Sequence, residues 1–288
     1  MSGWTIGIIG GSGLYEIEAL EEVQRIAVDT PWGAPSEELT LGRLHGIRFV
    51  FLPRHGRGHR IAPGDVNYRA NIDALKRAGC TDLVAISAIG SLREELPPGR
   101  FVLIDQFVDR TVARAASFFG TGLVAHVSMA DPVCPRLSRL AADAAETAGA
   151  EVTRGGSYLA MEGPQFSSRA ESELYRQWGC DVIGMTAMPE AKLAREAELP
   201  YALVGMVTDY DCWRPGEAVD VAEVLTQLQA NAGTARRLVE ALALALPAER
   251  VPSPIDTNLD SALITAPAAR DPAMLMKLDA VCRRVLKA

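Results

Sequence analysis

Short apolar runs alternate with stretches of helical periodicity along most of this chain, a pattern that predicts an α/β fold. Residues 181–183 and 201–207 are apolar runs that predict buried strands, and the stretch between them, 187–198, has the spacing of a helix. The pattern therefore predicts a βαβ unit. Asp209 and Asp211 follow its second strand, at a carboxyl end, where open parallel sheets bind ligands. Because the two residues are two apart, an extended backbone places both carboxylates on one side, where they suit a ligand with two donors.

Other stretches extend this pattern. Strands are predicted at residues 5–9, 39–44, 47–52, 82–86, 101–107 and 157–161, the second and third joined by the turn His45-Gly46. Helices are predicted at residues 67–79 and 131–149, after the capping box of Ser168 and Glu171, after Asp220, and after Asp271-Pro272. We interpret residues 1–246 as one domain, a mixed and largely parallel central β-sheet flanked by helices. Residues 247–288 are predicted to form a C-terminal linker and helix that pack on the body or on a neighbouring subunit.

Two strand ends have the character of anion-binding turns. Residues 10–13 are Gly-Gly-Ser-Gly, which can present backbone N–H groups and the Ser12 hydroxyl to an anion. Glu16 stands where the dinucleotide-binding fingerprint needs its third glycine, and the Gly-Lys of a P-loop is absent, so a phosphate turn is predicted rather than a nucleotide fold. Ser87 and Ala88 offer a second turn of this kind. An ordinary tight turn and close helix–sheet packing are the structural alternatives.

A local cationic cluster follows the predicted hairpin. Three arginines and two histidines lie within residues 54–60 of a chain that is acidic overall. Arginine presents a planar fork that matches phosphate oxygens. His55 and His59 have the i, i+4 spacing of a metal pair on a helix, but Gly56 and Gly58 disfavour a helix and the neighbouring cations repel a metal ion. The cluster therefore favours an oxyanion site over a metal site, and a solvated basic loop is the alternative.

Composition excludes several classes of protein. The 288 residues carry a net charge of −7 and no run of Lys or Arg, which disfavours nucleic-acid binding. Hydrophobic residues make up 48% of the chain, enough for a substantial core, yet no apolar run approaches the length of a membrane span. Five scattered cysteines without CxxC spacing argue against a disulfide framework or a zinc site. With no signal-peptide pattern at the start, we expect a cytoplasmic protein without a metal.

Several motifs between about residues 5 and 230 belong together. They are Gly10-Gly11-Ser12-Gly13, Arg54-His55-Gly56, Glu162-Gly163-Pro164-Gln165-Phe166-Ser167-Ser168-Arg169, Met185-Thr186 and Thr208-Asp209-Tyr210-Asp211-Cys212-Trp213. Jointly they resemble the 5′-methylthioadenosine phosphorylases, which belong to the trimeric branch of the purine nucleoside phosphorylases. The tail after about Pro247 lies outside this resemblance.

The resemblance implies a role for each matching position. Inorganic phosphate would be held by Ser12, Arg54, His55, Ser87, Ala88 and Thr186. Ribose and adenine would be held by Met185, Phe166, Ser167, Asp209 and Asp211, the two acids also being the catalytic pair. A 5′-methylthio pocket would be formed by His59, Val221, Val224 and Leu225, together with His126 from the adjacent subunit. Serine at 12 and 87 and alanine at 187 stand where the animal enzymes carry threonine, and Gly184 replaces an asparagine.

The implied activity is phosphorolysis of methylthioadenosine, with inorganic phosphate as co-substrate and no cofactor, in a homotrimer or a dimer of trimers. A carboxylate suits the amino group at carbon 6 of adenine, whereas the 6-oxopurine enzymes of this fold typically use asparagine. The alternative is thus a 6-oxopurine nucleoside or methylthioinosine phosphorylase. A nucleoside-binding protein on the same scaffold is the non-enzymatic alternative, although it would not need Arg54, His55 and Thr186 together.

Overall fold

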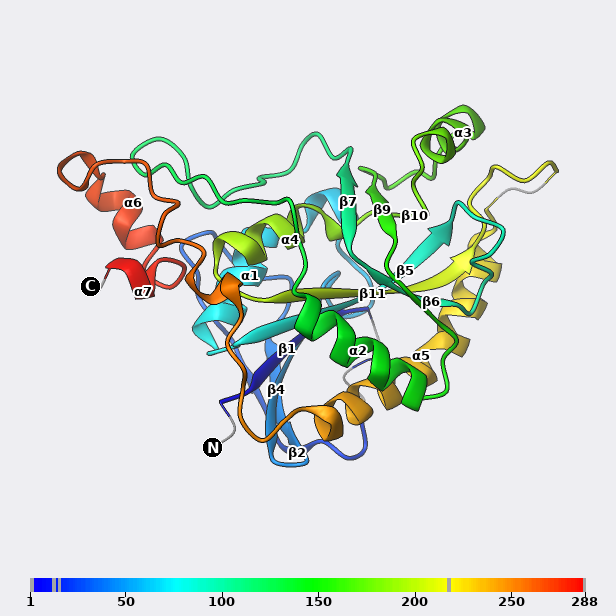
Figure 1. Ribbon diagram of the computed structural model, residues 1–288, viewed down its shortest axis with the longest axis horizontal. Helices are drawn as coiled ribbons and strands as arrows, with labels where there is room; N and C mark the ends of the chain where they lie inside the picture. The colour runs from blue at the N-terminus through cyan, green and yellow to red at the C-terminus, as the bar shows by residue number, and fades with distance from the viewer. Residues whose placement is uncertain (1–2, 12–13, 15–16, 217–218, 287–288) are drawn as a thin grey trace.

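The computed structural model describes residues 3–11, 14, 17–216 and 219–286. Within these residues eleven strands form one mixed sheet (Figure 1). Their bounds are β1 Thr5–Gly10, β2 Glu21–Ile26, β3 Leu39–Leu44, β4 Ile47–Pro53, β5 Asp82–Ser91, β6 Phe101–Ile104, β7 Gln106–Asp109, β8 Val152–Arg154, β9 Ser157–Ala160, β10 Val182–Gly184 and β11 Tyr201–Asp209. The main path runs β2-β3-β4-β1-β5-β10-β9-β7, while β11 pairs with both β5 and β6, and β6 pairs with β8.

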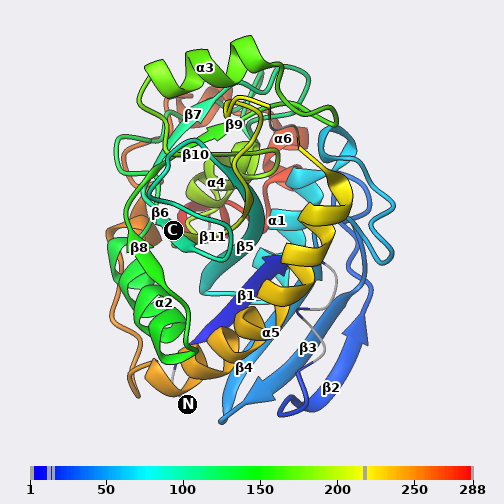
Figure 2. The same ribbon diagram turned by 90° about the vertical axis from the view of Figure 1, so that its right-hand side faces the viewer.

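Helices cover both faces of this sheet. Their bounds are α1 Tyr68–Arg77, α2 Pro135–Thr147, α3 Arg169–Gln177, α4 Ala187–Glu196, α5 Val221–Ala245, α6 Pro272–Lys277 and α7 Arg283–Leu286. Figure 2 shows α2 and α5 in front of the sheet and α1 and α4 behind it. Each pair buries apolar side chains against the sheet, and the two resulting core clusters lie on opposite faces. The predicted class, a mixed and largely parallel sheet flanked by helices, is confirmed.

Local signals predicted many elements correctly. The two-residue turn between β3 and β4 has positive φ at both His45 and Gly46, the conformation that the twist of a tight hairpin favours. Both hydrogen bonds of the capping box between Ser168 and Glu171 are present at the start of α3. Asp220 caps α5 by accepting from two backbone N–H groups. The sequence predicts these features correctly because each depends only on residues that are close together in the chain.

Other predictions about elements were wrong. The helix expected from Asp131 begins at Pro135, because the N–H of Cys134 donates to the carbonyl of Tyr201 on β11 and holds the preceding segment against the sheet. Strands β2 and β8 were not predicted, since neither presents a buried apolar run. The last helix divides into α6 and α7, with Leu278 closing α6.

The largest correction concerns β10 and β11. They were predicted to form a parallel βαβ unit, but β10 pairs antiparallel with β5, whereas β11 pairs parallel with β5. Val182 and Ile183 pair with Ser91 and Gly90, so β10 starts at the far end of β5 and runs back along it. The residues after β10 and the residues after β11 therefore still meet beside the same part of β5.

The C-terminal residues join the body of the molecule. Leu259, Leu278 and Val281 are buried in the same core cluster as α1 and α4. Ala125, in the long segment after β7, forms a β-bridge with Leu263, and in Figure 1 this segment crosses the top of the molecule towards α6. Arg284 of α7 pairs with the buried Glu198 at 2.6 Å. A domain boundary after residue 246 stays a prediction.

Candidate active site

An interruption along one edge of β5 lies at the centre of the predicted site. β11 pairs with one edge of β5 from Leu83 to Gly90. On the other edge β1 pairs as far as Ala85, and β10 pairs only with Gly90 and Ser91. Among the described residues, 86–89 therefore have no strand partner on that edge. We call these four positions the β5 gap. The carboxyl ends of β1 and β10 border it, and β4 ends beside β1, so the side chains that follow these strands converge there.

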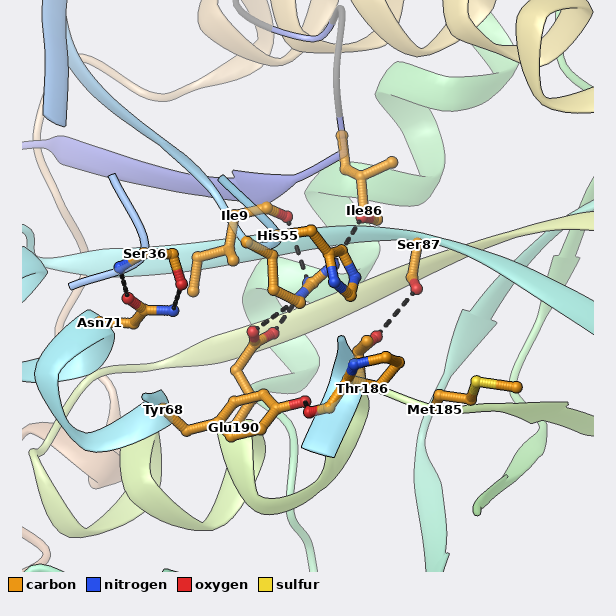
Figure 3. A network of polar contacts seen from close by, with 12 residues as sticks. Ile9, Ser36, His55, Tyr68, Asn71, Ile86, Ser87, Met185, Thr186 and Glu190 are labelled. Atoms are coloured by element: carbon orange, nitrogen blue, oxygen red, sulfur yellow. Dashed lines mark hydrogen bonds and ion pairs between the residues drawn. The ribbon is translucent and has the colours of Figure 1, made fainter. Parts of the chain in front are cut away.

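Ser87 and Thr186 meet at the β5 gap. Thr186 follows β10 and is the N-cap of α4, but its hydroxyl does not cap the helix. Instead its Oγ1 lies 3.1 Å from Oγ of Ser87 (Figure 3). The next residue on β5 is the half-buried Ala88. Since a helix N-terminus attracts negative charge, this hydroxyl pair is well placed for an anion. Ser12, the other predicted hydroxyl, lies outside the described residues.

Arg54 reaches the β5 gap from the end of β4. Its Nε and Nη2 donate to the two carboxylate oxygens of Glu190, at 2.7 and 3.0 Å, and both side chains are buried, at 2% and 1% exposure. Nη1 donates to the carbonyl of Ile86 at 3.3 Å, and Nη2 also donates to that of Ile9 at 3.4 Å (Figure 3). Of the five guanidinium hydrogens, these contacts occupy four, so one hydrogen on Nη1 has no partner among the described residues. Glu190 balances the charge of Arg54, so a ligand meets an oriented donor rather than an isolated cation.

His55 is a neutral imidazole. Its Nδ1 lies 2.9 Å from the carbonyl oxygen of Ile61. A carbonyl only accepts, so Nδ1 carries the hydrogen and Nε2 presents a lone pair. Burial, and then the charge of Arg54, lower the pKa of His55 to about 4. The exposed ring of His59 stacks on it, with centroids 4.3 Å apart. The two rings are in contact although residues 55–59 form no helix. The left-handed backbone of His59, φ 55°, is one of the turns that bring the chain back.

We expect His55 to stay uncharged above about pH 5. The NMR signal of its ring should not titrate between pH 8 and pH 5, and a His55→Gln variant assigns that signal among the four histidines. Between pH 6.5 and 4 the unfolded chain takes up a proton that folded His55 refuses, so acidification through this window lowers stability. The Gln variant lacks that contribution. A titration midpoint near 6.5 would contradict the neutral assignment.

Asp209 ends β11 at an irregularity of the sheet. The register shifts between Val207 and Asp209, which pairs with Gly90, and such bulges re-aim side chains. Its Oδ2 accepts from the Thr208 hydroxyl at 2.7 Å and its Oδ1 from the Asp211 N–H at 2.8 Å. A Cβ at Gly90 would lie 3.0 Å from Oδ1, so glycine makes room for the carboxylate. Burial raises the pKa of Asp209, although both hydrogen bonds favour its charged form.

Asp211 is placed differently from the prediction. It has a left-handed backbone, φ 53°, so the two acids do not share one extended strand, because the chain turns back as the Asp211 N–H donates to Asp209. The carboxylates are nevertheless neighbours. Asp211 is 5% exposed, and its Oδ2 has no hydrogen-bond partner in the part of the chain that is described. Burial raises its pKa to about 6, and the nearby Ser172 hydroxyl, which by distance and angle makes no hydrogen bond within the described residues, only partly offsets this effect. An unpaired buried acceptor of this kind is suited to a ligand donor.

The residues predicted for ribose and base lie around these acids. The side chain of Met185 packs against Gly163, whose φ of 69° only glycine adopts readily. Ser167 is buried, and its hydroxyl is close enough to Asp211 to lower the pKa of that carboxyl. Phe166 is 45% exposed, so nearly half of its surface is open to solvent. Their roles in binding stay predictions.

The structure explains the glycine at position 184. The hydroxyl of Tyr158 occupies the space that a Cβ at Gly184 would need. The same hydroxyl accepts from the N–H of Thr186 at 3.3 Å. A larger residue at 184 would displace Tyr158 and with it the backbone of the hydroxyl pair.

The residues predicted for the 5′ pocket are open to solvent in this single chain. Val221 and Leu225, in the first two turns of α5, are 56% and 51% exposed. His59 and His126 are exposed as well, and Val224 is half-buried. The N–H of His126 donates to the carbonyl of Ala262 in the C-terminal segment. A pocket formed by these side chains, and the loan of His126 to another subunit, stay predictions.

Two residues at the site escaped the sequence analysis. Glu190, the partner of Arg54, lies 136 positions along the chain, and in sequence it is an ordinary residue of a helix. Arg114 lies in the irregular stretch after β7, yet its side chain is 1% exposed. The only signal for Arg114 in the sequence is that no acidic residue lies close to it in the chain, and this signal is weak.

Other features do not compete with this site. A cavity of ≈ 390 Å³ lies between β6, β8 and α2, and none of the predicted site residues lines it. In the described part of the chain, no group of three or more His, Cys, Asp and Glu side chains could hold a metal ion. Among the same residues, no helix is both long and apolar enough to span a membrane.

Comparisons with known proteins identify the class first. A family model described as Phosphorylase superfamily matches residues 5–243, and the chain belongs to that superfamily. An S-methyl-5′-thioadenosine phosphorylase from Cereibacter sphaeroides is 61% identical over 286 residues, 98% of each protein, and one from Bradyrhizobium diazoefficiens is 59% identical over 285 residues, also 98% of each. Within the superfamily, the chain is thus a member of the S-methyl-5′-thioadenosine phosphorylase family. The resemblance seen in the motifs is confirmed, and it extends through the C-terminal tail.

Solved structures agree. A methylthioadenosine phosphorylase from an Antarctic soil metagenomic library superposes with a TM-score of 0.92 at 44% identity, covering 98% of this chain and 99% of that one. A variant of the adenosine/methylthioadenosine phosphorylase from Schistosoma mansoni, in complex with methylthioadenosine, superposes with a TM-score of 0.79 at 39% identity, covering 84% and 91%.

Proposed function

We propose that this chain catalyses the phosphorolysis of 5′-methylthioadenosine to adenine and 5-methylthioribose 1-phosphate. The observation that carries the proposal is that hydroxyl donors and carboxylates lie close together along strand β5. Ser87 of β5 contacts the Thr186 hydroxyl on one side of the strand, and Gly90, three residues on, pairs with Asp209 on the other. Anion donors and a carboxylate pair thus lie a few residues apart, which suits a phosphate beside a purine. The names of the relatives point to the same substrate.

In the proposed reaction, a phosphate oxygen attacks the anomeric carbon of the ribose from the face opposite the base. The bond from this carbon to the purine nitrogen breaks, and its electron pair passes to the purine. Thr186, Ser87 and the remaining N–H of Arg54 align the phosphate, so much of the rate enhancement comes from positioning. Asp209, whose pKa burial raises, shares or donates the proton that neutralises the departing base.

Asp211 supplies the preference for adenine. Its unpaired Oδ2 accepts from the amino group at carbon 6, a donor that adenine has and hypoxanthine lacks. A 6-oxopurine would bring a carbonyl oxygen against this buried acceptor and leave both without a partner, at a cost of about 1–3 kcal/mol or more. The unpaired oxygen therefore favours a 6-aminopurine substrate over the 6-oxopurine alternative.

The proposal also covers the co-substrate, the assembly and the location of the protein. Inorganic phosphate is the co-substrate, and no cofactor is required by the chemistry above. We propose a homotrimer in which His126 of one subunit reaches the 5′ pocket of another, which would cover the exposed Val221 and Leu225. We also propose a cytoplasmic location, supported by five free cysteines that are all buried.

The test is to incubate the purified protein with methylthioadenosine, with and without phosphate, and to compare kcat/KM for methylthioadenosine, adenosine and inosine. We expect adenine release to require phosphate, and 5-methylthioribose 1-phosphate to form in equal amount. Methylthioadenosine should exceed adenosine by about 10- to 200-fold, the range for one small apolar group. Inosine should be the poorest substrate. Adenine release without phosphate, or a preference for inosine, would contradict the proposal.

A further inference from the structure

Arg114 is the most heavily hydrogen-bonded side chain beside the proposed site, and nothing in the proposed mechanism uses it. It lies between β7 and α2, in the long segment that has no helix or strand at this point. Its guanidinium is buried and contacts Glu162 Oε1 at 3.1 Å, the Tyr68 hydroxyl at 3.0 Å, and the carbonyls of Glu162 at 2.5 Å, Met185 at 2.6 Å, Met188 at 2.7 Å and Met161 at 3.5 Å.

The carbonyl acceptors belong to two segments of the site. Met161 and Glu162 follow β9 and lead into the turn that carries Phe166. Met185 and Met188 follow β10 and lie on either side of Thr186 in sequence. Arg114 therefore ties the segment expected to hold the base to the segment expected to hold phosphate and ribose.

The local backbone explains why an arginine is needed. Met188 has an extended conformation inside α4, φ −117° and ψ 135°, so its carbonyl leaves the helical direction and takes a donor from elsewhere. A planar fork with five N–H groups can serve the Glu162 carboxylate and carbonyls on two segments at once. An ammonium is a single point with three donors, too few for all of these acceptors. The negative charge that Arg114 needs is supplied by Glu162. Burial raises the pKa of Glu162, but the hydrogen bonds from the Val112 N–H and from Arg114 outweigh burial and hold this pKa below its usual range.

We propose that Arg114 is a positioning residue for phosphorolysis. By holding the carbonyls of Met185 and Met188, it fixes the backbone on both sides of Thr186, and it ties this backbone to the start of the Phe166 turn. It acts through these groups and not as a phosphate ligand, since its donors are directed at protein acceptors. The proposal rests on the proposed function, because it assigns a task within that reaction.

The test compares Arg114→Gln and Arg114→Lys with Arg110→Gln. Arg110 is exposed, lies in the same segment and stacks over Trp178 at 5.8 Å, so its variant removes the same charge away from the site. Steady-state kinetics with methylthioadenosine and phosphate varied separately give kcat and both KM values, and circular dichroism gives the folded fraction. We expect kcat per folded protein to fall about 10- to 100-fold in both Arg114 variants, as misplacement by about 1 Å would cause. Each KM should change less than kcat, and the Arg110 variant should match the wild type.

Each result has a definite meaning. A wild-type kcat per folded protein in Arg114→Gln would overturn the positioning role, because Arg114 would then be merely structural. A wild-type kcat in Arg114→Lys would also overturn it, because a positive charge alone would then be sufficient. If neither Arg114 variant folds, Glu162→Gln carries the test, because it removes the charge partner and keeps the carbonyls. A kcat lowered at least threefold then supports the proposal, and an unchanged kcat overturns it. A wild-type protein without phosphorolysis would instead reject the proposed function itself.

Discussion

Replacing Asp209 by asparagine is expected to lower kcat/KM for methylthioadenosine by about 10²- to 10⁴-fold, the range for loss of a general acid. Asparagine has the same shape and keeps both contacts, because its oxygen can accept from the Asp211 N–H and its amide can donate to the Thr208 hydroxyl. That hydroxyl can then turn its hydrogen wholly to the carbonyl of Ile89. The loss would therefore report the missing carboxyl proton rather than a displaced backbone.

The choice of base should change instead in Asp211→Asn. An amide at position 211 can donate to a 6-oxopurine, so in that variant the ratio of kcat/KM for inosine to that for methylthioadenosine should rise, whereas in Asp209→Asn it should not. Asp29→Asn is the matched control, since Asp29 is exposed and far from β5 in the sequence, and it should behave as the wild type. A turnover of Asp209→Asn within threefold of the wild type would show that this carboxyl has no part in base departure.

Replacing Arg54 by methionine should reduce both stability and activity. Removing one partner of a buried ion pair leaves Glu190 charged and unpaired, at a cost of about 3–5 kcal/mol in the free energy of unfolding. Loss of the remaining Nη1 hydrogen bond to phosphate, about 1.5–3 kcal/mol, should lower kcat/KM for phosphate by about 10- to 100-fold. Chemical denaturation and steady-state kinetics measure the two effects separately.

A second substitution separates the two roles of Arg54. Glu190→Gln removes the buried charge but keeps an acceptor for the Tyr201 hydroxyl, which now donates to Oε1 at 2.9 Å. The double variant Arg54→Met, Glu190→Gln should therefore regain much of the lost stability, while kcat/KM for phosphate stays low. If the double variant regained both, Arg54 would serve only to hold Glu190 and would not be a phosphate ligand.

The parts of the fold that could be predicted from the sequence are those that depend on nearby residues. The hairpin at His45-Gly46, the capping box at Ser168 and the cap at Asp220 each need only a few adjacent positions. Strand direction depends on partners elsewhere in the chain, so the pattern around 181–207 predicted two strands and a helix correctly but made β10 and β11 parallel.

The candidate site divides in the same way. Motifs named the residues that gather at the β5 gap, because a family likeness is carried by residue identity. They did not predict that Arg54 is bound to Glu190 or that Asp211 adopts a left-handed backbone, since both follow from contacts formed only in the folded chain. Arg114 was missed for the same reason, as its acceptors are backbone carbonyls, which carry no sequence signal.

The central claim is that phosphate and adenine bind at opposite ends of one site along β5. A crystal structure with phosphate and the unreactive 7-deaza analogue of methylthioadenosine tests it most directly. We expect phosphate oxygens within about 2.6–3.2 Å of Oγ of Ser87 and Oγ1 of Thr186, and the amino group of the base at a similar distance from Oδ2 of Asp211. Phosphate bound away from this hydroxyl pair, or a base whose amino group does not reach Asp211, would contradict the account.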